Sequence, residues 1–323
     1  MGYTTGKELH INVPLSNIAI NYQDTIDLAG VIAPIVRVQK QADSYYKFSV
    51  AEAYAIENDV RAPGTEPNRI TRSVTSETYF CKNYALADFL TYEDAVNVDA
   101  GLILTSRESR TRWLKRKLIQ GNNYRLSLQC TSGSNVGSYS AVGSNWSDGT
   151  TGHSAPYTDI KTAINNVCGV IGEEYRNDLT IVFGKTAWQE YRDHADIRTL
   201  VYGTAGTGPN GRIVKQEQVK ELHEVKRVYV ANAMYNTVQE GQTASLSCMW
   251  DVDVLICYTP DQPSIDVPSF MYTFMWPRVM DMQAMIHQVP RSYREDIHVG
   301  WYLDNKITCA QAGFIISDVR SSV

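Results

Sequence analysis

The sequence has no uninterrupted run of 18 apolar residues, so it predicts no membrane-spanning helix and no membrane partner. It has no CxxC pair, and its six cysteines are spread from Cys81 to Cys309, which argues against a zinc site or a redox motif. We interpret these cysteines as small buried apolar residues in a reducing cytosol. No HExxH, HxH or GxSxG motif and no Walker lysine occurs. We therefore expect no metal, no cofactor and no catalytic residue, and we predict that the protein is not an enzyme.

Composition and charge set broad limits. The 323 residues are 43% apolar and 20% charged, which is typical of globular proteins and sufficient for two domains. The net charge of −5 argues against a general binder of polyanions. The opening residues, MGYTTGKELHINVPLS, show no basic-then-apolar leader, and Gly6 stands where a myristoylation signal needs Ser or Thr. We expect neither targeting signal.

The stretch from Asp94 to Leu128 organises the chain. It has no proline, and its two glycines, Gly101 and Gly121, lie near its ends. Its apolar residues recur at roughly helical spacing. We predict one long helix from about Val98 to Gly121, with a second piece beyond it left open. Such a helix would be roughly 35 Å long.

The predicted helix is basic in its second half. Residues 107–117 hold six basic side chains and one acidic side chain, for a net charge of +5. This pattern fits contact with nucleic acid, or a solvated helix face that pairs with acidic arms of neighbouring copies. Charge runs are usually solvated faces, and we favour the second alternative. The candidate basic face comprises Arg107, Arg110, Arg112, Lys115 and Arg116.

The chain before this helix predicts extended arms. Residues 1–30 are polar with isolated apolar anchors, which fits either a frayed terminus or an arm that gains order from other surfaces. Residues 31–40 predict a strand, and Arg69–Cys81 predicts a second one, with Val74, Ser76, Thr78 and Phe80 on one face. The polar excursion between them carries too little apolar surface to bury itself. It should therefore pack against the body or against a neighbouring subunit.

The chain after the helix predicts a small α/β domain. A Gly/Ser-rich loop or linker spans residues 131–156, and a helix follows from Tyr157 through Ile171. Further segments are the strand 179–183 ended by Gly184, a helix through His194, the helix 215–222 and the strand 227–230. We also predict strands at 247–258, 270–276, 297–303 and 307–319.

Two patterns suggest chemistry only weakly. Residues 206–211 match GxGxxG, but no strand precedes them and Pro209 interrupts the turn, so we interpret them as a surface loop. Asp251 and Asp253 would lie about 7 Å apart on one face of a strand. They could act as an acid–base pair or hold a metal, but a solvated strand face is the simpler interpretation.

The order of these segments resembles the major capsid protein of tailed bacteriophages, with the Hong Kong 97 capsid fold. Ile32–Val36 with Lys40–Tyr46 is similar to the start of the family's extended loop, and Thr78–Leu86 to its return. Glu108–Trp113 lies where the family has its spine helix. Segments similar to the axial domain are 179–194, 228–233 and 249–258, and segments similar to closing peripheral strands are 272–276 and 312–317.

The resemblance implies an α+β fold with an N-terminal arm, an extended loop, a long spine helix, a peripheral domain and an axial α/β domain. The expected boundaries are 1–30 for the arm and 31–92 for the extended loop with flanking strands. The spine helix and Gly/Ser-rich loop occupy 93–156, the axial domain 157–260 with a start between 157 and 178, and returning peripheral strands 261–323. The loop would contact the adjacent subunit through Glu57, Asp59, Arg61, Glu66, Arg69 and Arg72.

The resemblance also implies an assembly. We expect hexamers and pentamers of this chain in an icosahedral shell around double-stranded DNA, located in the virion and assembled in the host cytoplasm. The similarity begins near Ile11, so we expect a separate scaffolding protein, besides a portal and room for a decoration protein. Two alternatives stay open. One is an encapsulin-type nanocompartment shell, and the other is an enzyme with a site built from scattered residues.

Overall fold

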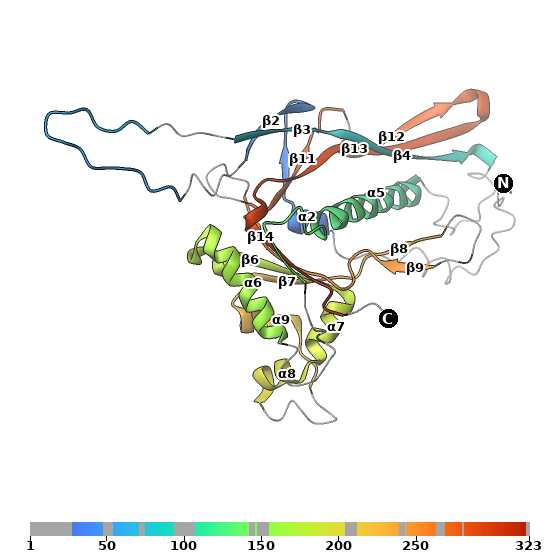
Figure 1. Cartoon of the computed structure of the whole chain (residues 1–323). Helices are drawn as coiled ribbons and strands as arrows, with labels where there is room; N and C mark the ends of the chain where they lie inside the picture. Colours follow the sequence, from blue (N-terminus) through green and yellow to red (C-terminus); the bar gives the residue numbers. More distant parts are fainter. Residues whose placement is uncertain are drawn as a thin grey trace.

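A computed structural model describes residues 28–47, 54–70, 75–93, 107–141, 146, 155–203, 212–238, 243, 245–262, 269–279 and 281–320. Figure 1 shows the long helix α5 beneath one sheet, and a second sheet with helices α6 to α9 in the lower part of the molecule. A loop without regular secondary structure extends far from the body on the side of β2 and β3.

Helix α5 spans Arg107–Cys130. The predicted end at Gly121 is wrong, because a mid-helix glycine costs only about 1 kcal/mol and Leu126 and Cys130 are buried in the following turns. The predicted start near Val98 lies outside the described residues. Leu114 and Leu118 pack against strand residues Ile297 to Leu303, and this apolar contact fixes the helix to the sheet.

The sheet above α5 joins remote parts of the chain. Its strands are β1 (Ile35–Arg37), β4 (Lys82–Thr91), β11 (Met271–Met275), β12 (Asp281–Val289) and β13 (Arg294–Ile307). β13 is antiparallel to β4, β11 and β12, and β1 lies parallel to β11. The predicted strands at 270–276 and 297–303 are confirmed. The predicted strand at 31–40 is only partly correct, because Leu28–Ile32 form the short helix α2.

A separate two-stranded hairpin, β2 (Ala42–Lys47) with β3 (Thr75–Phe80), carries the extended loop. The predicted strand from Arg69 is wrong for its described residues Arg69 and Ile70, which are not in a strand. Of the residues predicted to share one face, Ser76, Thr78 and Phe80 lie in β3, and this face is exposed. Tyr79 is buried against Tyr272 and Phe274 of β11, whereas Phe80 is exposed. Because Tyr79 packs against the aromatic side chains of β11, Tyr79 lies on the buried side of the hairpin and Phe80 on the exposed side.

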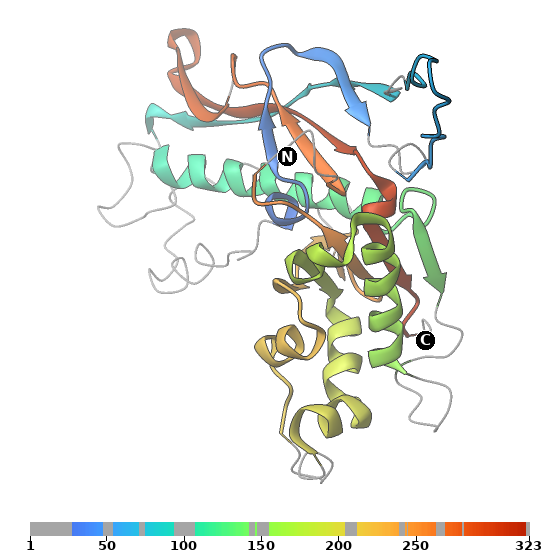
Figure 2. The ribbon, with the colours of Figure 1, turned by 90° about the vertical axis from the view of Figure 1, so that its left-hand side faces the viewer.

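The second sheet has the strand order β5-β14-β10-β6-β7. The strands are β5 (Ser138–Ala141), β6 (Leu179–Gly184), β7 (Arg227–Ala231), β10 (Val254–Tyr258) and β14 (Gly313–Ser317). The helices are α6 (Pro156–Ile171), α7 (Lys185–Asp193), α8 (Ala195–Tyr202) and α9 (Gln216–His223). Figure 2 shows these helices grouped away from α5. The predicted helices and strands between 157 and 231 are confirmed.

Three predictions for this sheet need correction. The predicted strand 247–258 consists of β9 (Leu246–Cys248) and β10, and β9 pairs instead with β8 (Met234–Asn236) in a small hairpin. The Gly/Ser-rich segment is not only a linker, since it supplies β5. β14 pairs with β10 and β5, so it does not lie with the returning strands of the other sheet. The predicted domain boundaries themselves stay a prediction.

The break between β9 and β10 has a physical cause. The backbone oxygens of Trp250 and Asp251 accept hydrogen bonds from the amides of Lys185, Thr186 and Ala187 at the start of α7. These amides have no partner inside the helix. A Cβ at Gly184 would lie 2.3 Å from the Asp251 oxygen, so only glycine allows this approach.

Candidate assembly surfaces

The extended loop, described over residues 54–70, is exposed along its whole length. Its apolar side chains have no cover, since Ile56 is 99% exposed and Val60 is 83% exposed. Near its tip Arg61 Nε donates to the Thr65 oxygen at 2.7 Å, Thr65 Oγ1 donates to the Ala62 oxygen at 2.8 Å, and Asn68 Nδ2 donates to the Asn58 oxygen at 3.4 Å. At its start the Tyr54 hydroxyl donates to the Val170 oxygen of α6. The bonds near the tip shape a turn but bury nothing.

The predicted interface residues are placed along this loop. Arg69 pairs with Glu66 at 3.5 Å, and both side chains are exposed. Glu57 and Asp59 form no ion pair within the described part of the chain. Arg72 lies outside the described residues. The structure therefore presents both signs of charge on one exposed segment.

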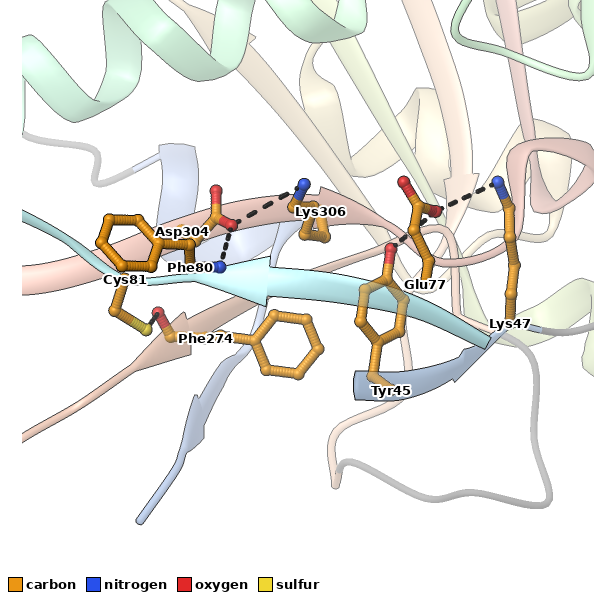
Figure 3. Close-up of polar contacts among 8 residues, drawn as sticks. All are labelled: Tyr45, Lys47, Glu77, Phe80, Cys81, Phe274, Asp304 and Lys306. Carbon is orange, nitrogen blue, oxygen red and sulfur yellow. Dashed lines mark hydrogen bonds and ion pairs between the residues drawn. The ribbon is translucent and has the colours of Figure 1, made fainter. Parts of the chain in front are cut away.

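The base of the loop is held to the body, as Figure 3 shows. The Tyr45 hydroxyl donates to Glu77 at 3.0 Å, and Lys47 lies 3.4 Å from the same carboxylate. Asp304 of β13 accepts the Phe80 amide at 3.0 Å, and Cys81 Sγ lies 3.5 Å from the Phe274 oxygen. Burial, with the Glu77 carboxylate beside it, raises the pKa of Tyr45. The base is therefore anchored while the rest of the loop projects.

The predicted basic face of α5 is not a uniform surface. Arg110 lies 2.8 Å from Asp88 of β4 and donates at 2.8 Å to the Phe89 oxygen, so it ties the helix to the sheet. Arg112 is exposed, whereas Lys115 and Arg116 are half-buried. The side chain of Arg107 lies outside the described part. Further along, the Arg125 guanidinium stacks 3.8 Å from the centre of the Tyr84 ring.

Asp251 and Asp253 do not form the predicted pair on a strand face, because residues 249–253 lie between strands. The Asp251 carboxylate accepts the Thr186 hydroxyl and the Thr186 amide at the start of α7. Asp253 is half-buried, and burial raises its pKa to about 6. The Asp251 carboxylate thus has a structural role at the start of α7. The GxGxxG segment 206–211 lies outside the described residues.

No other chemical site emerges from the described part of the chain. Its His, Cys, Asp and Glu residues include no group of three that could hold a metal ion. An open polar depression lies between α7 and the β8–β9 hairpin, lined by Lys185, Thr186, Gln189, Met234, Leu246, Ser247, Cys248 and Asp251. None of its side chains forms a nucleophile–base pair in the described contacts. No helix among the described residues is long and apolar enough to cross a bilayer.

Sequence reasoning missed several positions that the structure makes candidates for an assembly contact or for the anchor of the loop. The exposed apolar residues Ile56, Val60 and Ile70 lie in a segment that the sequence analysis described only by its polar and charged residues. Asp304 was missed because its partner, the Phe80 amide, is 224 residues away. An apolar residue in an otherwise polar excursion was the available signal for Ile56 and Val60, and no local signal marks Asp304.

Comparison with known proteins gives consistent matches. The chain is 27% identical over 259 residues to the major capsid protein of Pseudomonas phage JBD67, covering 74% of each. It resembles a solved phage-related protein from Bordetella bronchiseptica RB50, at 20% identity and a TM-score of 0.70 over 96% and 97% of the two chains. It also resembles the capsid of Cyanophage P-SCSP1u, at 9% identity and a TM-score of 0.58 over 98% and 95%. No protein-family profile matches the chain.

These matches confirm the resemblance to phage major capsid proteins and the predicted α+β capsid fold. The match with the phage protein extends over most of both sequences, and the structural matches cover nearly the whole chain. The match with the phage protein favours a viral capsid protein over either alternative, the encapsulin-type compartment or the enzyme.

Proposed function

We propose that the protein is the structural major capsid protein of a bacteriophage, which assembles with copies of itself into a closed shell in the virion. The observation that carries the proposal is the extended loop. Ile56 and Val60 are almost fully exposed on a segment that the chain anchors at its base and does not cover. Exposed apolar side chains on a projecting segment fit a protein–protein contact, and a second copy of the same chain supplies it in every shell position.

In this proposal the copies form hexamers and pentamers of an icosahedral shell. The charged loop residues Glu57 and Asp59 then pair with basic groups of the neighbouring copy, while Ile56 and Val60 lose their exposure. A loop that docks on a neighbour is stabilised by the assembly, whereas an isolated loop of this composition is not stable in water. The chain acts here without catalysis.

The remaining partners are also proposals. The enclosed cargo is double-stranded DNA on the inner face of the shell. A separate scaffolding protein directs assembly in the host cytoplasm, a portal occupies one vertex, and the outer surface leaves room for a decoration protein. Co-purification of packaged DNA distinguishes this shell from an encapsulin-type compartment, which would carry a cargo protein.

Shortening residues 55–70 tests the proposal. The shortened chain should stay folded, because those residues bury nothing within the subunit, but it should not form stable closed particles under electron microscopy. Equal numbers of normal particles from the shortened and the unaltered chain would show that the loop is not the contact we propose.

A further inference from the structure

The extended loop has a second attachment to the body, at Tyr54, besides the anchor at its base. The Tyr54 hydroxyl donates to the backbone oxygen of Val170 in α6, and Figure 1 shows the start of the loop close to this helix. In the described part of the chain, the other hydrogen bonds of residues 54–70 stay within the loop. One hydroxyl group therefore makes the polar link between the described loop and the rest of the subunit.

The acceptor of this bond lies on a well-packed helix end. α6 ends at Ile171, so the Val170 oxygen lies in the last turn, where backbone oxygens have no amide partner inside the helix. Val167, Cys168 and Ile171 of the same turns are buried, and Val170 itself packs against the same core. The Tyr54 hydroxyl thus binds an oxygen that lacks a helix partner and that the core holds in place.

The two attachments of the loop belong to different sheets. At the base, the Phe80 amide donates to Asp304 of β13 in the sheet above α5. α6 packs instead on β10 and β14 of the second sheet. Tyr54 follows the end of β2 at Lys47 by seven residues. A segment held only at its base can swing about that base, and a second attachment at Tyr54 restricts the swing.

The hydroxyl accounts for this attachment better than the ring does. The Tyr54 side chain is 56% exposed, so its ring adds little packing. An exposed hydrogen bond of this kind shifts an equilibrium between two loop directions by about two- to ten-fold. Only the fraction of subunits whose loop already points correctly can dock without a further rearrangement, so the apparent affinity between copies rises with that fraction.

We propose that Tyr54 is a positioning residue for assembly. Its bond to α6 holds the loop in the direction in which the loop meets a neighbouring copy, before that copy arrives, and the bond persists in the shell. Tyr54 acts through Ile56 and Val60, which make the contact. This inference rests on the proposed function, because it takes the loop to be the surface that binds the neighbour.

The first test uses the unassembled subunit and the variant Tyr54→Phe, which removes only the hydroxyl. Spin labels are attached at Ala62→Cys in the loop and at Thr162→Cys on α6, two exposed positions. Cys248 is the one cysteine that is not buried, so every chain carries Cys248→Ser. Pulsed electron paramagnetic resonance should give one narrow label-to-label distance distribution in the unaltered chain, and a distribution about two-fold broader in Tyr54→Phe.

The matched control is Tyr46→Phe on β2, where the tyrosine is 66% exposed. This variant should keep the narrow distribution. The urea midpoint of unfolding should be the same in all three chains, because the Tyr54 bond directs the loop and does not hold the core. A broad distribution in the unaltered chain, or equal widths with and without the hydroxyl, would overturn the proposal. So would a lower urea midpoint for Tyr54→Phe at an unchanged width, which would show a purely structural bond.

The second test measures assembly by light scattering. Tyr54→Phe should assemble about two- to ten-fold more slowly than the unaltered chain, and Tyr46→Phe should assemble normally. Equal or faster assembly of Tyr54→Phe would overturn the proposal. The variant Ile56→Ser/Val60→Ser separates this failure from a failure of the proposed function. If that variant also assembles normally, the loop is not the contact between copies, whereas the distance measurement still decides whether Tyr54 directs the loop.

Discussion

At the scale of single residues, the buried His223 and the half-buried Asp253 change the stability of the fold in opposite directions as the pH falls. Burial, with Arg176 adding to it, lowers the pKa of His223 from 6.5 to about 4, and the ring bonds Tyr191 at 2.6 Å. This group stabilises the fold above pH 6.5, and that contribution is lost as the pH falls toward 4. Burial raises the pKa of Asp253 from 3.8 to about 6. Its carboxylate therefore destabilises the fold at pH 7, and this cost disappears as the pH falls from 6 to 3.8.

The two contributions are each about 2–3 kcal/mol, so they should nearly cancel in the unaltered chain between pH 6.5 and 4. Asp253→Asn removes one of them, and its free energy of unfolding should fall by about 2–3 kcal/mol on acidification. His223→Gln removes the other, and its stability should rise over the same range. Urea unfolding of the unassembled variants at pH 7 and 4.5 checks this. Parallel pH profiles of the two variants would contradict the assignment.

Arg110 provides a second test at the residue scale. Its guanidinium holds Asp88 and the Phe89 oxygen, and both ion-pair partners are mostly buried. Arg110→Met should lower the free energy of unfolding by about 1–3 kcal/mol, because it leaves the Asp88 carboxylate and a carbonyl oxygen without their donor. Lys117→Met, on the exposed side of the same helix, should change it by less than about 0.5 kcal/mol. Equal effects would show that Arg110 is only another surface charge.

At the scale of elements, β14 decides whether the α/β sheet forms. It lies between β5 and β10, and all five of its residues are buried. A chain that ends at residue 312 loses an internal strand, and we expect it to give no cooperative thermal unfolding transition. A chain that ends at Arg320 keeps β14 and is the matched control. A cooperative transition in the shorter chain, at an unchanged midpoint, would contradict this role.

The sequence predicts a helix or strand well where the apolar pattern of that element alone determines which of its side chains are buried. α6 and β6 were predicted closely because a regular helical period and a short apolar run specify each of them without a distant partner. β5 was not predictable from Ser138–Ala141, since a polar segment becomes a strand only through its pairing with β14. The end of the strand after Cys248 was not predictable either, because it depends on hydrogen bonds to the start of α7, which is distant in the sequence. For the assembly surfaces, the sequence indicated a loop that needs a partner, while the exposed positions Ile56 and Val60 became visible only in the structure.

At the scale of the whole molecule, the fold separates subunit stability from assembly. The buried apolar residues lie in the two sheets, in the helices that pack on them and in the segments that connect these elements, and the extended loop holds none among its described residues. Ile56→Ser/Val60→Ser should therefore change the free energy of unfolding of the unassembled chain by less than about 0.5 kcal/mol. The same variant should assemble at least ten-fold less efficiently by sedimentation, because each copy loses two apolar anchors. The Leu200→Ser chain, altered at a similar exposed leucine outside the loop, should assemble normally.

The central claim is that a second copy of this chain covers the extended loop. A cryo-electron microscopy reconstruction of the assembled particle tests it most directly. We predict closed shells in which residues 54–70 of each copy lie on a neighbouring copy, with Ile56 and Val60 buried there and Glu57 and Asp59 beside basic side chains. A loop folded back on its own subunit, a loop left in solvent inside intact shells, or a uniform small oligomer without shells would contradict the account.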